Sequence, residues 1–168
     1  MDFVAQAVGI IAMAVSALSL AQKNTKTILV IQIFSNILFG THYFLLGAYA
    51  GAALNVLSMV RSLIIRQKNH KWANPKIWFP IFVLSFAVAV YFSGDGLLGL
   101  LPFAGCIFMT IAFYIDDGTK ARRFIACSSP CWMTYNALSL SIGGVIAEII
   151  NICSLISAFI RFDIKRGK

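Results

Sequence analysis

Seven apolar stretches follow one another along the chain, separated by short polar or glycine-containing breaks. Each is close to the roughly 20 residues that an α-helix needs to cross the hydrocarbon core of a bilayer. They cover residues 3–21, 27–46, 48–66, 77–93, 97–115, 124–140 and 143–161. The pattern predicts an all-α, polytopic membrane protein with seven transmembrane helices.

The composition agrees with this prediction. The 168 residues are 60% hydrophobic and 12% charged, with a mean hydropathy of +0.84, whereas soluble domains contain about 25% charged residues. So few charges cannot coat a soluble globule, which excludes a soluble catalytic domain, a disordered chain and a nucleic-acid-binding module. The first stretch has neither a basic leader nor a small-residue cleavage site, so we expect a membrane span and not a cleavable signal peptide.

The distribution of basic residues supports seven spans. The 14 Lys and Arg residues lie in or beside alternate connections and in the tail, and the amino terminus and the remaining connections contain none. The positive-inside rule then places the amino terminus outside and the carboxyl terminus inside. We expect the basic segments to bind anionic lipid headgroups on the inner face, and Arg61 to snorkel toward the same headgroups.

The first three and the last three predicted helices share one pattern: a helix, a basic connection and a tight hairpin. Three residues of the first hairpin recur at a constant offset in the second. These are Gly47, Asn55 and Ser58, matched by Gly143, Asn151 and Ser154. We interpret residues 1–66 and 97–168 as parallel three-helix repeats, the second with a basic tail, joined by an inner basic loop and inverting linker helix at 67–96. Gly47, Gly143 and Gly144 are expected to form the tight turns.

This three-one-three layout with an outer amino terminus resembles the SWEET and PQ-loop superfamily of transporters. The residues more closely resemble the bacterial inner-membrane YgjV family, in the run from Arg122 through Pro130, Trp132 and Asn136 to Glu148, and in Leu45–Tyr49 of the first half. The resemblance implies a SWEET-like fold in the cell inner membrane, and it brings no substrate. The PQ-loop pair is changed here to Ala21-Gln22, and helices one and two lack the prolines of the sugar transporters, so the first repeat is expected to be stiffer.

Polar and aromatic residues form stripes at helical spacing on the predicted second, third, sixth and seventh helices. If the two repeats face each other, these stripes converge on a cavity suited to a small polar, neutral or weakly charged solute. The candidate solute-binding residues are Asn36, His42, Asn55, Trp132, Tyr135 and Asn151. The SWEET resemblance places Asn55 and Asn151 where paired asparagines contact sugar. The alternatives are helix packing for the polar positions, a neutral packed histidine for His42 and an interfacial anchor for Trp132.

Glu148 is the single acidic residue inside a predicted span. A charged side chain at mid-membrane costs about 2.5–3.5 kcal/mol, so Glu148 is a candidate proton or cation site, with a structural hydrogen bond or a wetted carboxyl as the alternative. Pro130, within the sixth span, is a candidate hinge.

The sequence contains no catalytic constellation, and the four cysteines lack metal-ligand spacing, so we expect no enzyme activity, cofactor or metal. The leading hypothesis is a transporter or facilitator that works by alternating access, with proton coupling left open. The alternative is a membrane receptor or scaffold with a ligand pocket on the same fold. Whether two copies form a homodimer is also left open.

Overall fold

Seven long helices make up the protein in the computed structural model, which describes residues 3–20, 25–68, 70–115 and 117–160. They are α1 (Phe3–Leu20), α2 (Thr25–Leu45), α3 (Tyr49–Arg66), α4 (Pro75–Ser93), α5 (Leu100–Tyr114), α6 (Gly118–Leu138) and α7 (Ile142–Ala158). Short 3₁₀ turns, η1 (Lys71–Ala73) and η2 (Gly96–Gly99), precede α4 and α5. The described residues contain no strand, so the prediction of seven helices in an all-α chain is confirmed.

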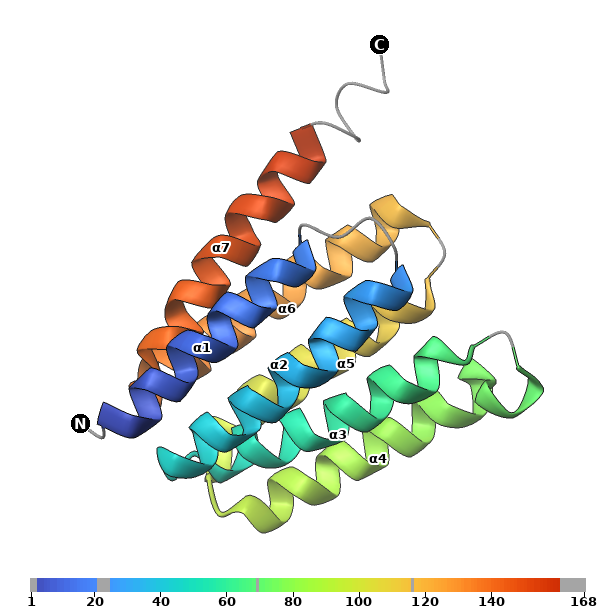
Figure 1. Ribbon diagram of the computed structural model, residues 1–168. Coiled ribbons are helices and arrows are strands. Elements are labelled where there is room, and N and C mark those ends of the chain that lie inside the picture. Colours follow the sequence, from blue (N-terminus) through green and yellow to red (C-terminus); the bar gives the residue numbers. More distant parts are fainter. Residues whose placement is uncertain (1–2, 21–24, 69, 116, 161–168) are drawn as a thin grey trace.

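The helices run side by side in one bundle (Figure 1). They contain 15 to 21 residues, which at 1.5 Å per residue gives lengths of about 22–32 Å, close to the thickness of a bilayer core. α4 and the continuous segment Gly96–Tyr114 are each long and apolar enough to cross a membrane, and Phe3–Leu18, Val30–Leu45 and Ile142–Ser157 are apolar but shorter.

Six of the helices form a closed ring. α1 packs on α2, α2 on α3, α3 on α5, α5 on α6, α6 on α7, and α7 returns to α1. α4 lies outside this ring against α3 and α5, as the green helix at the edge of the bundle shows (Figure 1). A cluster of buried apolar side chains, including Leu54, Phe82, Phe86 and Cys106, fills the space where α4 meets α3 and α5. The ring has two contacts between its first three helices, the first half, and its last three, the second half: α3–α5 and α1–α7. The fourth helix covers the α3–α5 contact and leaves the α1–α7 contact uncovered.

The start of α6 differs from the sequence prediction. The apolar stretch begins at residue 124, whereas the helix begins at Gly118. Asp117 precedes it, and its Oδ1 accepts hydrogen bonds from the backbone N–H groups of Thr119 and Lys120, at 2.9 and 3.2 Å. An aspartate cap stabilises a helix start wherever it occurs. Hydropathy missed this turn because its residues are basic and polar while their backbone is helical.

The α2–α3 and α6–α7 connections are the same turn. Gly47 has φ +73° in the first and Leu140 has φ +54° in the second. The backbone bond from Ala48 N to Tyr43 O is repeated, also at 2.9 Å, from Ser141 N to Asn136 O. The predicted role of Gly47 in the turn is therefore confirmed. The predicted role of Gly143 and Gly144 is wrong, because both residues lie inside the first turn of α7 and Leu140 takes the left-handed position.

The two hairpins lie 93 residues apart along the chain. α2 runs from 25 to 45 and α6 from 118 to 138, and the turn residues 47 and 140 have the same separation. This correspondence differs by three residues from the one predicted through Gly47 and Gly143. Three residues are nearly one helical turn, so the predicted alignment kept the right helix faces and chose the wrong partners.

Gly143 instead allows α1 and α7 to approach closely. A Cβ atom on Gly143 would lie 2.5 Å from the backbone carbon of Gly9. On the opposite side of the ring, Ala50 occupies the position 93 residues before Gly143, and its Cβ lies 3.3 Å from a Cβ built on Gly99. The two contacts therefore differ: backbone meets backbone at α1–α7, whereas at Gly99, the residue before α5, the neighbouring atom from α3 is the Ala50 methyl carbon.

Candidate functional site

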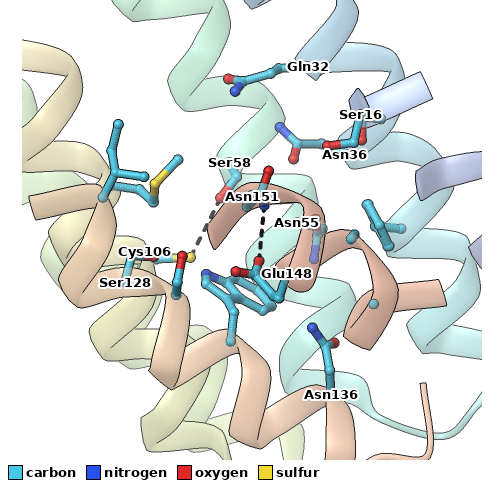
Figure 2. A pocket seen from close by; sticks show the side chains of 18 of the residues that line it. Ser16, Gln32, Asn36, Asn55, Ser58, Cys106, Ser128, Asn136, Glu148 and Asn151 are labelled. Carbon is cyan, nitrogen blue, oxygen red and sulfur yellow. Dashed lines mark hydrogen bonds between the residues drawn. The ribbon is translucent and has the colours of Figure 1, made fainter. Parts of the chain in front are cut away.

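The ring of helices encloses a cavity of about 530 Å³. Its walls come from α1, α2, α3, α5, α6 and α7, the six helices of the ring. Figure 2 shows amide, hydroxyl and carboxylate side chains from these helices, among them Gln32, Asn36, Asn55, Glu148 and Asn151, around one space. Polar groups inside a membrane bundle either hold helices together or line a path, and here they surround open volume.

Most lining residues occur in pairs 93 residues apart, one in each half of the chain. The pairs are Ser16 and Met109, Gln32 and Ile125, Ser35 and Ser128, Asn36 and Ser129, Phe39 and Trp132, Tyr43 and Asn136, Asn55 and Glu148, Ser58 and Asn151, and Arg61 and Ser154. Corresponding helix faces of the two halves therefore line the cavity, although the side chains at matching positions are mostly different.

Four of the six predicted solute-binding residues line the cavity: Asn36, Asn55, Trp132 and Asn151. Asn55 and Asn151 face the same space but do not correspond to each other, since Asn55 is matched by Glu148. Asn55 Nδ2 donates to Gly51 O at 2.8 Å, so part of its hydrogen-bonding capacity is already used within α3. The indole of Trp132 packs against Gly105, in keeping with a cavity wall and not with an interfacial anchor.

The other two predicted residues, His42 and Tyr135, are fully buried and do not line the cavity. They correspond to each other across the halves, and each is bonded to the start of a helix in the opposite half. His42 Nε2 lies 2.7 Å from the Oγ of Ser141, the N-cap of α7, and His42 Nδ1 lies 2.7 Å from Ala5 O. For His42 the structure therefore matches the alternative of a packed histidine.

Tyr135 secures the start of α3 together with Asp95. The Tyr135 hydroxyl accepts from Gly51 N at 2.8 Å and donates to Asp95 Oδ2 at 3.0 Å, and the same carboxylate oxygen accepts from Ala50 N at 3.0 Å. The first N–H groups of a helix have no partner within it, and these two side chains supply partners from α6 and from the α4–α5 connection. Tyr135 thus caps α3 from the opposite half and does not line the cavity.

A hydrogen bond between corresponding residues crosses the cavity near the ends of α2 and α6. The Tyr43 hydroxyl donates to Asn136 Oδ1, and Tyr43 stacks at 6.2 Å on Trp132. Tyr43 and Asn136 lie two positions before the ends of their helices, whereas Arg122, which also lines the cavity, lies near the start of α6. Side chains joined across the two halves therefore close the cavity at the end where α2 and α6 finish.

The described surface cations gather at the opposite end of the bundle. Arg66 ends α3, Lys68 and Lys71 follow it, Lys76 lies in the first turn of α4, and Lys120 lies in the first turn of α6. We call this the basic end. Lys23, Lys26 and the tail cations fall outside the residues whose side chains the structure describes.

Glu148 lines the cavity from α7 and is partly buried. Its Oε1 lies 3.4 Å from Asn151 Nδ2, the contact dashed in Figure 2. Within the described ranges no cation forms an ion pair with this carboxyl. The structure places this acidic residue of the predicted seventh span in the cavity wall; its role as a proton or cation site stays a prediction.

Arg61 is the cavity residue that sequence reasoning placed wrongly. The expectation that it snorkels to the headgroups is wrong, because it is 4% exposed and lines the cavity. Its Nη1 donates to Cys106 O and Thr110 Oγ1 at 3.2 and 3.1 Å, and its guanidinium carbon lies 5.2 Å from the Phe113 ring centroid. Helical side chains lean toward the helix N-terminus, which carries this one away from the basic end.

A signal for Arg61 was present in the sequence. Asn55, Ser58 and Arg61 have i, i+3 spacing, so Arg61 lies on the same polar stripe of α3 as the predicted site asparagine. The hydropathy pattern drew attention to its position near a helix end. The polar stripe indicated the location of Arg61 correctly, whereas its position near the helix end did not.

Pro130 lies inside α6, and its side chain is exposed on the outside of the ring. It lines a second, apolar groove of about 350 Å³ between α6 and α7. A proline in a helix interior removes one backbone hydrogen bond and permits a bend, so its role as a hinge stays a prediction. No group of three or more His, Cys, Asp or Glu side chains that could hold a metal ion occurs among the described residues.

Comparison with known proteins identifies one family. The family model described as a bacterial inner membrane protein, Imp-YgjV, matches residues 3–166. The curated inner membrane protein YgjV of Escherichia coli (strain K12) is 29% identical over 153 residues, which cover 87% of this chain and 77% of the relative. No solved structure was found to match the chain.

Proposed function

Because the chain belongs to the YgjV family of bacterial inner membrane proteins, we propose that it carries a small polar solute across that membrane. The observation that supports this proposal is the cavity itself, which is lined by corresponding faces of two three-helix units. Solute sites near the midplane, at the interface between repeats, are typical of secondary transporters. A protein that only anchored or scaffolded others would have no need of a polar space there.

The proposed topology is SWEET-like: two parallel three-helix repeats joined by α4 as an inverting helix, with the amino terminus outside and the basic end inside. On this topology the Tyr43–Asn136 bond closes the outer end of the cavity. The conformation is then inward-facing. Alternating access requires that the bonds between the two halves at the outer end break while contacts at the inner end form.

Purified protein in liposomes tests transport directly. A panel of uncharged, zwitterionic and anionic small solutes is screened for flux, with and without a pH gradient. A double-cysteine variant tests the mechanism. It combines Tyr43→Cys with Asn136→Cys in a background in which the four native cysteines are replaced, and a short bismaleimide cross-links the two new thiols. We expect cross-linking to stop flux of any solute that the uncross-linked variant carries, because the outer end can no longer open.

The single-cysteine variants treated with the same reagent are the matched control, and they should retain flux. Flux that persists after complete cross-linking would contradict alternating access. Absence of flux for every solute, together with a thermal shift by one of them, would contradict transport and support a receptor.

A receptor or scaffold with a ligand pocket but no through-route is the second candidate. Residues 3–20 and 25–45 contain no proline, so α1 and α2 lack the breaks that ease bending of membrane helices. The same liposome experiment separates the two candidates, since a receptor binds solute without moving it.

A further inference from the structure

The cavity contains an arginine, Arg61, that has no acidic partner among the residues that the structure describes. Arg61 is 96% buried, and both of its hydrogen bonds, to Cys106 O and Thr110 Oγ1, come from Nη1. Its Nε is buried with no hydrogen-bond partner. Across the ranges that the structure covers, no carboxylate forms an ion pair with it. Taking a guanidinium out of water is costly unless an anion and further acceptors compensate.

The ring contacts of Arg61 compensate only part of this cost. Phe113 and Phe86 lie 5.2 and 6.0 Å from the guanidinium carbon, and such cation–π contacts contribute modestly. A charge meant only to join α3 to α5 could be replaced by a neutral side chain with fewer unsatisfied donors. Arg61 therefore has donors on its guanidinium that remain available for an oxyanion. Guanidinium groups recognise oxyanions in a bidentate manner.

The other charged groups of the cavity fit the same interpretation. Arg122 lines it near the basic end, where its Nη2 donates to Thr119 Oγ1 at 3.2 Å. Among the described lining residues, Glu148, which lies on α7, is the one that carries a carboxyl group. Glu148 corresponds to Asn55 and lies six residues before Ser154, the position that corresponds to Arg61, so about 9 Å separates these two positions along α7. The half of the cavity nearer the basic end is therefore electropositive.

We propose that the cavity binds the anionic group of its solute at Arg61, so that the solute class is small organic anions, including carboxylate-bearing zwitterions, and not neutral sugars. The proposal specifies the substrate class of the proposed function and rests on it. The electrostatic part can be tested at equilibrium, without any flux. Failure of transport and failure of this inference are therefore distinguishable.

Quenching of Trp132 fluorescence tests the sign of the potential in the cavity. The chain has three tryptophans, and Trp72→Phe with Trp78→Phe leaves Trp132, in the cavity wall, as the single emitter. Iodide, caesium and acrylamide serve as anionic, cationic and neutral quenchers at constant ionic strength in detergent. We expect the quenching constant for iodide, scaled to acrylamide, to exceed that for caesium by about threefold, because a cleft lined by one sign of charge concentrates counter-ions.

Variants identify the residue responsible. Arg61→Gln should abolish the preference for iodide, and Arg61→Lys should retain it. Arg66→Gln, which removes an exposed cation at the end of the same helix, is the matched control and should quench like the parent. Equal quenching by iodide and caesium in the parent, or an unchanged preference in folded Arg61→Gln, would overturn the proposal.

Paired solutes complete the test in the same detergent. Glutarate and 4-aminobutyrate carry a carboxylate, and glutaramide is a neutral analogue of similar size. We expect both carboxylates to protect Trp132 from iodide in the parent but not in Arg61→Gln, and glutaramide to protect in neither. Protection by glutaramide equal to that by glutarate would overturn the inference even if transport is established.

Discussion

The first and second halves of the ring contain a matching helix and turn, but their side chains differ in chemistry. α2 and α6 have the same length, and the turns after them contain the same hydrogen bonds 93 residues apart. At matching positions of the cavity lining, however, Asn55 corresponds to Glu148 and Arg61 corresponds to Ser154. Helices from both halves line the cavity at positions 93 residues apart. The differences between the walls give it a cation on one side and a carboxyl on the other, which a symmetric pair of repeats could not provide.

The largest expected effect lies at the contact where the halves differ most in packing. Gly143→Ala places a Cβ 2.5 Å from the Gly9 backbone carbon, and a backbone cannot give way as a flexible side chain can. Overpacking of this kind costs about 1–3 kcal/mol, and we expect a lower thermal midpoint in detergent. Ala50→Gly, at the corresponding position of the other contact, should cost no more than about 1 kcal/mol. Equal losses for the two variants would show that the two contacts do not differ.

The next effect concerns the bond that joins corresponding residues. Tyr43→Phe removes the hydroxyl that donates to Asn136 Oδ1 and leaves a buried acceptor without its partner, which costs about 1–3 kcal/mol. The proposed function predicts a larger outward-open population. Labelling of an Asn55→Cys reporter, in the background without native cysteines, should become faster from the outside with a membrane-impermeant maleimide. Thr134→Ala, whose hydroxyl donates to Pro130 O within α6, is the control. Faster labelling in that control too would point to general loosening.

A third prediction separates the two walls by charge. If Glu148 takes up the coupling proton, Glu148→Gln retains the hydrogen bond from Asn151 and loses the titration, so flux should no longer respond to a pH gradient. Its counterpart change, Asn55→Gln, alters the wall without removing a titratable group and should preserve the response while changing the apparent affinity. Full, equally pH-dependent flux in Glu148→Gln would remove the proton role.

The smallest effect comes from the turns themselves. Leu140 adopts a left-handed conformation that costs a residue with a Cβ about 1–2 kcal/mol relative to glycine. Leu140→Gly should relieve part of this strain, increase the free energy of unfolding by up to about 1 kcal/mol and so raise the thermal midpoint slightly. Gly47→Ala should lower the free energy of unfolding by a similar amount, because φ is +73° at Gly47. No atom lies within 4 Å of an added Cβ, so the backbone conformation alone accounts for the loss. Changes of the same sign would show that the two turns are not equivalent.

The number of helices was predictable from the sequence because it depends on hydropathy, which each segment expresses by itself. The position of Arg61 was harder to predict because it depends on which way a long side chain leans and on the α5 carbonyl that receives it. The roles of His42 and Tyr135 depend on helix starts in the opposite half, and no local pattern reports those. The correspondence between the halves was misassigned because identical residues, Asn55 and Asn151, occur one turn out of alignment.

The α1–α7 contact joins the first and the last of the described helices. Gly9 and Gly143 are separated by most of the chain, and at about 5–20 residues per second the ribosome needs on the order of ten seconds to make the part between them. Throughout that interval α1 has α2 as a neighbour but lacks its second partner, and its glycine-containing face is open to lipid or to a chaperone. The ring therefore cannot close until α7 has been made, and a chain truncated before α7 would have no partner for this face of α1.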